Sequence, residues 1–309
     1  MGTPRTRPIL VATDEGLHRW DDGGTTRVEA LSGRAVGALA AGADAWWAIV
    51  EGREVWRSPD GTRWAPAAAV PPKRTATCLG LMPKRLWVGT AGAHLLCLEG
   101  DRLMPVPPFE EVDGRGAWHT PWGAPADVRS ISADPDGRVY VNVHVGGVVR
   151  SADGGATWRP TLPIDHDVHQ VLAPLGHPRL LLVAAFDGFG VSHDEGDTWH
   201  WGNAGLHAHY CRAVALAGET VILSASTGPR GRRAAVYRRR LPGDEPFERC
   251  RLGLPEWFSG NVDTGCLGAD GPTVALGTED GGVFRSSDAG ARWEAVVKGL
   301  APVRAVALG

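Results

Sequence analysis

Three arginines, Arg129, Arg212 and Arg304, stand near the start of short apolar segments and have side chains suited to binding an anion. A guanidinium fork matches a carboxylate or a phosphate with two parallel hydrogen bonds. Charges that converge in a protein interior are costly unless they are paired, hydrated or bound to a ligand. We therefore predict that these arginines bind a small anionic molecule as substrate.

Histidines in the same part of the sequence offer a second chemistry. His144, His169 and His209, with a carboxylate such as Asp187, supply imidazole and carboxylate ligands for one transition metal ion, namely Fe, Cu, Zn or Mn. A histidine flanked by carboxylates and arginines is also suited to proton transfer. On this basis His169 and Asp263 are the candidate catalytic residues of a metal-dependent oxidoreductase or hydrolase.

Two tryptophans are the candidate apolar contacts of the ligand. Trp118 and Trp122 belong to the segment 107–127, the longest one between predicted strands. Long loops without their own secondary structure often carry function. We expect this loop to fold over the site as a lid.

These residues lie far apart in the chain, and an internal repeat is the feature that would bring them together. Four segments are variants of one phrase: Ser58-Pro59-Asp60-Gly61-Thr62-Arg63-Trp64, Ser151-Ala152-Asp153-Gly154-Gly155-Ala156-Thr157-Trp158, Ser192-His193-Asp194-Glu195-Gly196-Asp197-Thr198-Trp199 and Ser287-Asp288-Ala289-Gly290-Ala291-Arg292-Trp293. The phrase resembles the Asp-box, SxDxGxTW, of sialidases, sortilin-type receptors and bacterial BNR proteins. In such a turn the aspartate accepts backbone N–H bonds and the tryptophan fills the wedge between blades, so we expect a structural role for these aspartates.

The spacing of the repeat gives the number of blades. From a degenerate copy at Asp22 the intervals are 38, 93, 41 and 94 residues, so each long interval hides one copy. The period of about 44 residues matches a four-stranded propeller blade. We predict an all-β fold over residues 1–309, a single seven-bladed β-propeller closed by the C-terminal strand 303–308 joining the N-terminal blade.

Aligned blades place two rings of side chains at one mouth of the central channel. The ring at the start of the innermost strands reads Arg304, Gly37, Thr77, Arg129, His169, Arg212 and Asp263. The ring at the turns after the second strands reads Asp14, Glu51, Ala91, His144, Asp187, Thr227 and Glu279. The alternative is that the acidic residues of the second ring pair the arginines in a purely structural salt-bridge lattice.

The resemblance implies two other functions. The three arginines are similar to the arginine triad of sialidases, which implies a glycoside hydrolase, but the FRIP motif is absent and only Tyr210 lies near the mouth. The chain also resembles the seven-bladed photosystem II assembly-factor family, which implies a scaffold that docks a protein partner.

Composition narrows the remaining possibilities. The net charge of -3 argues against a nucleic-acid partner and against a membrane surface. The five cysteines are odd in number and form no CxxC pair, which favours a reducing compartment, so we expect a cytoplasmic protein. The glycines lie in hairpin turns and predict no nucleotide cofactor. The 29 arginines against 3 lysines indicate a bacterial source.

Overall fold

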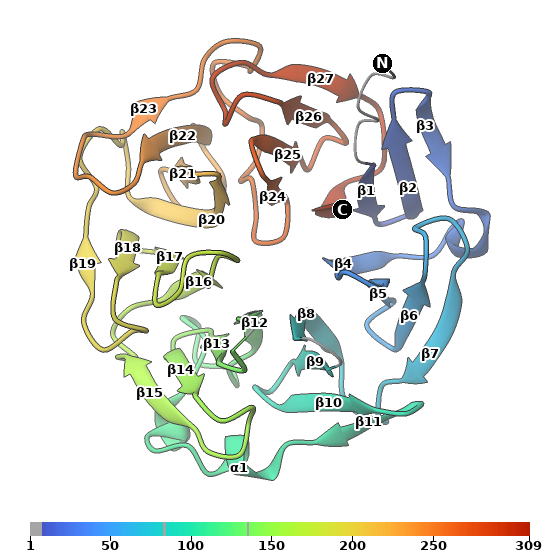
Figure 1. The fold of residues 1–309 in the computed structure, drawn as a ribbon, viewed down its shortest axis with the longest axis vertical. Helices are drawn as coiled ribbons and strands as arrows, with labels where there is room; N and C mark the ends of the chain where they lie inside the picture. Colours follow the sequence, from blue (N-terminus) through green and yellow to red (C-terminus); the bar gives the residue numbers. More distant parts are fainter. Residues whose placement is uncertain (1–7, 83–84, 135) are drawn as a thin grey trace.

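The computed structural model describes residues 8–82, 85–134 and 136–309. In this part of the chain, seven antiparallel sheets of four strands surround a central axis (Figure 1). The predicted all-β, seven-bladed fold is confirmed.

The strands of each blade run from the axis outwards. The innermost strands are β28 (Val303–Leu308), β4 (Val36–Ala41), β8 (Ala76–Met82), β12 (Val128–Ala133), β16 (Val168–Leu172), β20 (Tyr210–Ala217) and β24 (Leu267–Asp270). The second strands are β1 (Ile9–Thr13), β5 (Trp46–Val50), β9 (Arg85–Thr90), β13 (Val139–Val143), β17 (Leu181–Ala185), β21 (Thr220–Ser226) and β25 (Thr273–Gly277). The third strands are β2 (Gly16–Asp21), β6 (Glu54–Ser58), β10 (Leu95–Glu99), β14 (Gly147–Ser151), β18 (Gly188–Ser192), β22 (Ala235–Arg240) and β26 (Val283–Ser286).

The fourth strands form the rim of the disc. They are β3 (Gly24–Arg27), β7 (Ala65–Ala69), β11 (Arg102–Pro105), β15 (Arg159–Leu162), β19 (His200–Trp201), β23 (Glu248–Arg249) and β27 (Glu294–Val297). Short helices occur only in connecting segments of the described chain: η1 (Glu29–Leu31), α1 (Pro107–Glu110) and η2 (Arg115–Ala117). None of these helices is long and apolar enough to span a membrane.

The two ends of the chain share the first blade. Strand β28 pairs antiparallel with β1, with Ile9 opposite Leu308 and Val11 opposite Val306. The prediction that the C-terminal strand closes the ring is therefore confirmed. Closure removes the open sheet edge that would otherwise face solvent at the axis.

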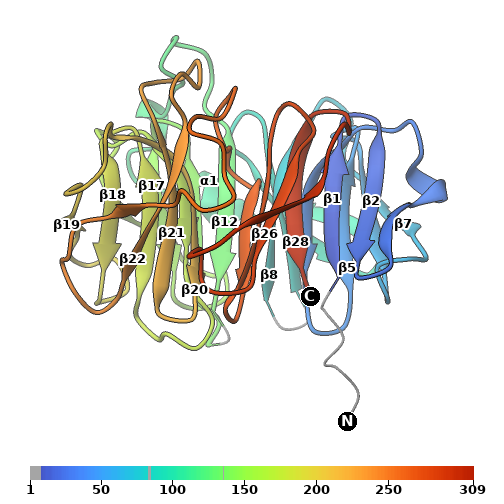
Figure 2. The same cartoon turned by 90° about the horizontal axis from the view of Figure 1, so that it is seen from above.

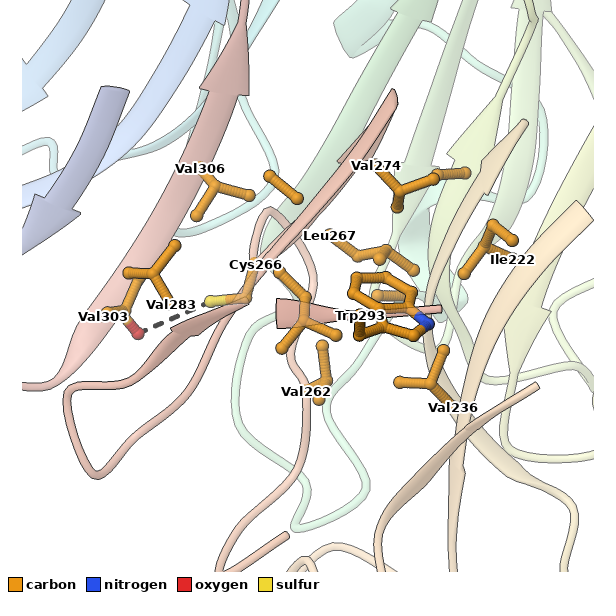
Figure 3. Packing of buried hydrophobic residues seen from close by; sticks show 14 of the residues in the cluster. Ile222, Val236, Val262, Cys266, Leu267, Val274, Val283, Trp293, Val303 and Val306 are labelled. Atoms are coloured by element: carbon orange, nitrogen blue, oxygen red, sulfur yellow. Dashed lines mark hydrogen bonds between the residues drawn. The ribbon is translucent and has the colours of Figure 1, made fainter. Parts of the chain in front are cut away.

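Apolar side chains fill the spaces between neighbouring blades. All five residues of β1, β13 and β17 are buried, because both faces of these strands are covered by adjacent blades. Between blades six, seven and one, Trp293 packs in a cluster with Ile222 and Val236, and the Cys266 thiol donates a hydrogen bond to the Val303 carbonyl (Figure 3).

The repeated phrases form turns after the third strands. The Ser151 hydroxyl accepts the Gly155 amide at 2.7 Å, the Asp153 carboxylate accepts the Thr157 amide at 2.8 Å, and the Trp158 indole donates to the Gly155 carbonyl at 3.1 Å. Hydrogen bonds from Thr157 lower the pKa of Asp153 to about 2. The expected structural role of these aspartates fits this arrangement.

One predicted strand starts later than expected. Asp263 was predicted at the start of the innermost strand of blade seven, but β24 begins at Leu267. A turn replaces the first half, because the Cys266 amide bonds the Asp263 carbonyl and Gly265 has a positive φ of 83°. Asp263 therefore lies in a loop before the strand and not at its start.

Candidate functional site

A funnel of about 750 Å³ opens at one end of the central channel. Its wall includes Arg129, Arg212 and Arg304, each on an innermost strand, and the carboxylates of Asp14, Asp127, Asp263 and Glu279. The loop residues Pro229, Arg230 and Asn261 extend the wall on the side of blades six and seven. Because strands within a blade are antiparallel, the turns of the repeated phrases lie at the opposite face of the disc.

The funnel continues into a narrower channel of about 170 Å³. Gly37, Thr77, Arg129, Thr264 and Arg304 line both spaces, so they mark the junction between them. Blades two and three contribute small residues here, whereas blades four and one contribute the arginines Arg129 and Arg304. The small side chains leave room for a ligand beside Arg129.

Two of the three predicted arginines are already paired. Arg304 donates two hydrogen bonds to Asp14, at 2.8 and 2.6 Å, and these hydrogen bonds lower the pKa of Asp14. Arg212 pairs with Asp263 and also donates to the Tyr210 hydroxyl at 3.0 Å. Burial pushes the pKa of Asp263 upward, but the hydrogen bond and charge of Arg212 outweigh it, so the pKa lies below its ordinary value.

Arg129 has no such partner. Within residues 8–82, 85–134 and 136–309 its guanidinium forms no hydrogen bond or ion pair with another side chain. Burial, and then the charge of Arg212, lower the pKa of Arg129, while Asp167 and Asp263 act in the other direction from a distance. Since arginine stays charged in proteins, the half-buried Arg129 carries a desolvation cost that no side-chain contact among the described residues offsets.

Two predicted histidines meet at a carboxylate that the sequence did not single out. The His144 Nε2 lies 3.5 Å from Asp167 Oδ1, and the His169 Nε2 lies 3.6 Å from Asp167 Oδ2. The His169 Nδ1 donates to the Cys211 carbonyl at 2.5 Å, which leaves its Nε2 buried without a hydrogen-bond partner. Burial is the largest influence on both imidazoles and lowers their pKa values, that of His144 to about 4.

The other predicted metal ligands lie elsewhere. Asp187 bonds His166 at 2.6 Å, and the His166 ring packs on Trp201. His209 is exposed in the segment before β20. As it stands, no group of three or more His, Cys, Asp or Glu side chains among the described residues is arranged to hold a metal ion.

The loop between β11 and β12 rises above one face of the disc (Figure 2). Its Trp118 packs on Phe109 and under the guanidinium of Arg115. Trp122 is 72% exposed, and its ring packs on that of His144 in a T-shaped arrangement with 5.4 Å between the ring centroids. Neither tryptophan is among the residues that line the funnel.

Sequence reasoning missed Asp167 and Thr264. The Thr264 hydroxyl contacts the carbonyls of His169 and Arg212, at 3.1 and 2.8 Å, and so links three blades. Asp167 was detectable, because it stands two residues before His169 and alternate residues of an extended segment point to one side. Nothing in the sequence pointed to Thr264.

Comparison with known proteins identifies the fold but not a family. No protein-family model matches the chain, and no curated protein matches it in sequence. Among solved structures, YCF48 bound to D1 peptide is similar with 15% identity and a TM-score of 0.56, over 85% of this chain and 83% of that one. YCF48 from Cyanidioschyzon merolae has 14% identity and a TM-score of 0.60, over 86% and 87% of the two chains.

A third similar structure is that of an ancestral GH74 enzyme. It has 14% identity and a TM-score of 0.64, and the match covers 96% of this chain but 40% of that one. At such identities the similarity shows the propeller fold alone.

Proposed function

We propose that this chain is a binding propeller whose funnel takes a carboxylate-bearing ligand at Arg129. The observation that carries the proposal is the contrast among the three arginines. Arg212 and Arg304 have carboxylate partners within the protein, whereas Arg129 has none among the described residues. A ligand carboxylate would offset the desolvation of this guanidinium.

The surroundings of Arg129 support a ligand of modest size. A funnel of about 750 Å³ falls within the range of small-molecule pockets, roughly 300 to 1,000 Å³. Gly37 and Thr77, in the two blades before that of Arg129, add small residues to the same wall. The Arg129 side chain lines both the funnel and the narrower channel, where a ligand carboxylate can reach it.

The ionisation of nearby carboxyl groups favours binding over glycoside hydrolysis. A glycosidase general acid needs a raised pKa so that it holds its proton near neutral pH. Asp14, Asp167 and Asp263 all have lowered pKa values and stay ionised. The similarity to the GH74 enzyme therefore supports a shared fold more than a shared reaction.

Calorimetric titration with hexanoate and glutarate tests the proposal. Arg129→Gln should weaken binding by about tenfold to a hundredfold, the worth of hydrogen bonds to a charged group, and Arg129→Lys should weaken it less. The matched control is Arg240→Gln, because Arg240 is exposed on β22 and, in the part of the chain that the structure describes, pairs only with Glu219. Equal affinity of the Arg129→Gln variant and the wild type would overturn the proposal.

A peptide is the second source of such a carboxylate. The similar YCF48 structure is bound to D1 peptide. In this chain Trp122, which packs on His144, and Phe186, which packs on Tyr210, are exposed at 72% and 56%. Exposed aromatic side chains are enriched where proteins bind one another. Titration with one peptide, as the free acid and as the C-terminal amide, separates a docked chain end from a free small acid.

A transition metal at His144 and His169 is a separate proposal, and its carboxylate ligand is Asp167 in place of Asp187. The supporting observation is the bare Nε2 of His169, which faces Asp167. The side chains would have to draw together by rotation to bind a metal. Elemental analysis of untagged protein should find metal in the wild type and in Asp187→Asn, but not in Asp167→Asn; metal-free wild type would dismiss the idea.

A further inference from the structure

The carboxylates at the turns after the second strands form a ring in which three members have a partner among the described residues of the protein and the fourth, Glu279, does not. Asp14 pairs with Arg304, Glu51 pairs with Arg34 at 2.6 Å, and Asp187 pairs with His166 at 2.6 Å. Glu279 occupies the same place in blade seven, is exposed and lines the funnel. Across the described ranges of the chain, no hydrogen bond or ion pair joins the Glu279 carboxylate to another residue.

The ring of arginines also has one member, Arg129, without a partner among the described residues. The positive charge of Arg129 and the negative charge of Glu279 do not neutralise each other. Arg129 belongs to the sheet of β12 and Glu279 follows β25, and the sheets of β16 and β20 lie between them along one side of the ring (Figure 1). Both side chains nevertheless line the same funnel.

The remaining charges of the funnel do not supply the missing partners. The charge of Glu279 raises the pKa of Arg304, but the guanidinium of Arg304 already makes two hydrogen bonds to Asp14. Asp127 accepts the Gly92 amide at 3.1 Å. Arg230 is exposed on the loop after β21 and completes the rim.

We infer that the ligand of the funnel is zwitterionic, with its carboxylate at Arg129 and an ammonium group facing Glu279. This inference rests on the proposed function and adds the second charge of the ligand. A dipolar ligand that spans the funnel satisfies both unpaired groups at once, whereas a simple anion leaves Glu279 unpaired and repelled. An ω-amino acid and a short peptide with a terminal carboxylate and a lysine share this chemistry.

The experiment compares ligands that differ only in the ammonium group. Calorimetry is run with hexanoate, 6-aminohexanoate and 8-aminooctanoate, and with a lysine-containing tetrapeptide as the free acid and as the amide. The wild type should prefer the better-fitting amino acid over hexanoate by about threefold to fivefold, because a partly exposed charge pair contributes modestly to affinity. Glu279→Gln should abolish that preference and strengthen hexanoate binding, because it removes a like charge from the funnel.

Glu51→Gln is the matched control, because Glu51 holds the same place in blade two but is bound to Arg34. It should keep the full preference for the amino acid. A preference that survives in Glu279→Gln, or that is missing from the wild type while hexanoate still binds, overturns this inference alone. If hexanoate binds the wild type and Arg129→Gln equally, the proposed function fails as well. A free-acid peptide that binds more tightly than the amino acids would identify the source as a chain end.

Discussion

At the scale of single residues, His144 shows how burial near the funnel lowers the pKa of an imidazole. Its ring is buried against Trp122 and lies near Arg129, and burial first, then the arginine charge, lowers its pKa from 6.5 to about 4. The unfolded chain therefore binds a proton at His144 between these two pH values, whereas the folded chain does not. Acid should thus favour unfolding in this window.

The expected effect is large enough to measure. The free energy of unfolding of the wild type should fall, from pH 6.5 to pH 4, by up to about 3 kcal/mol more than that of His144→Gln, at about 1.4 kcal/mol per pKa unit. Urea unfolding across this pH range checks the value. His200→Gln is the control, since His200 is exposed on β19, and identical pH profiles for wild type and His144→Gln would contradict the prediction.

The residues of the site were only partly predictable. Repeat alignment placed Arg129, Arg212 and Arg304 around one opening, because the position of an inner strand follows from the period. The side chains that these site residues contact could not be predicted from the repeat. Whether Asp167 or Asp187 faces the histidines depends on side-chain directions and on distances between blades, which a repeat pattern does not contain.

At the scale of elements, the turns after the third strands are small hydrogen-bonded units. Ser151 is fully buried, accepts the Gly155 amide and donates to Asp153, and Ser286 does the same in blade seven with Gly290 and Asp288.

The start of β24 shows the limit of element prediction. Repeat alignment put Asp263 at the start of the innermost strand of blade seven, but a turn ending at Cys266 precedes β24.

Removal of one of these hydroxyls should destabilise the fold. Ser151→Ala leaves the Gly155 amide without its acceptor, which costs about 1 to 3 kcal/mol for a buried donor. Ser286→Ala should cost a similar amount, and the double variant should show the sum within about 0.5 kcal/mol, because the turns share no partner. Urea unfolding measures these values against exposed Ser259→Ala, and a Ser151→Ala protein as stable as this control would show that the turn does not need the hydroxyl.

At the scale of the whole molecule, one strand pairing, that of β28 with β1, closes the ring of seven blades. Strand β28 covers the inner edge of β1 and carries Arg304, so the closing strand also builds the funnel. The number of blades was predictable from the period, and the closure from the unpaired first strand. The shape of the funnel was not, because it follows from how seven different side-chain sets fill a common axis.

Loss of the closing strand should abolish cooperative folding. A chain that ends at residue 302 exposes the inner edge of β1, and we expect broad unfolding and aggregation in place of one transition. A permuted chain with 303–309 linked ahead of residue 8 keeps the same pairing and should unfold like the wild type. Calorimetry and light scattering compare the two, and a monomeric, cooperative truncated chain would refute the requirement for closure.

The pairing of the chain ends also sets a delay during synthesis. Asp14 and Arg304 are 290 residues apart, and a ribosome that adds about 5 to 20 residues per second needs roughly a quarter of a minute to a minute to cross that distance. Until then the first blade lacks its innermost strand and exposes unpaired backbone groups. The nascent protein therefore completes both its ring and its ligand funnel only after residues 303–308 emerge, and its need for protection by chaperones falls in that interval.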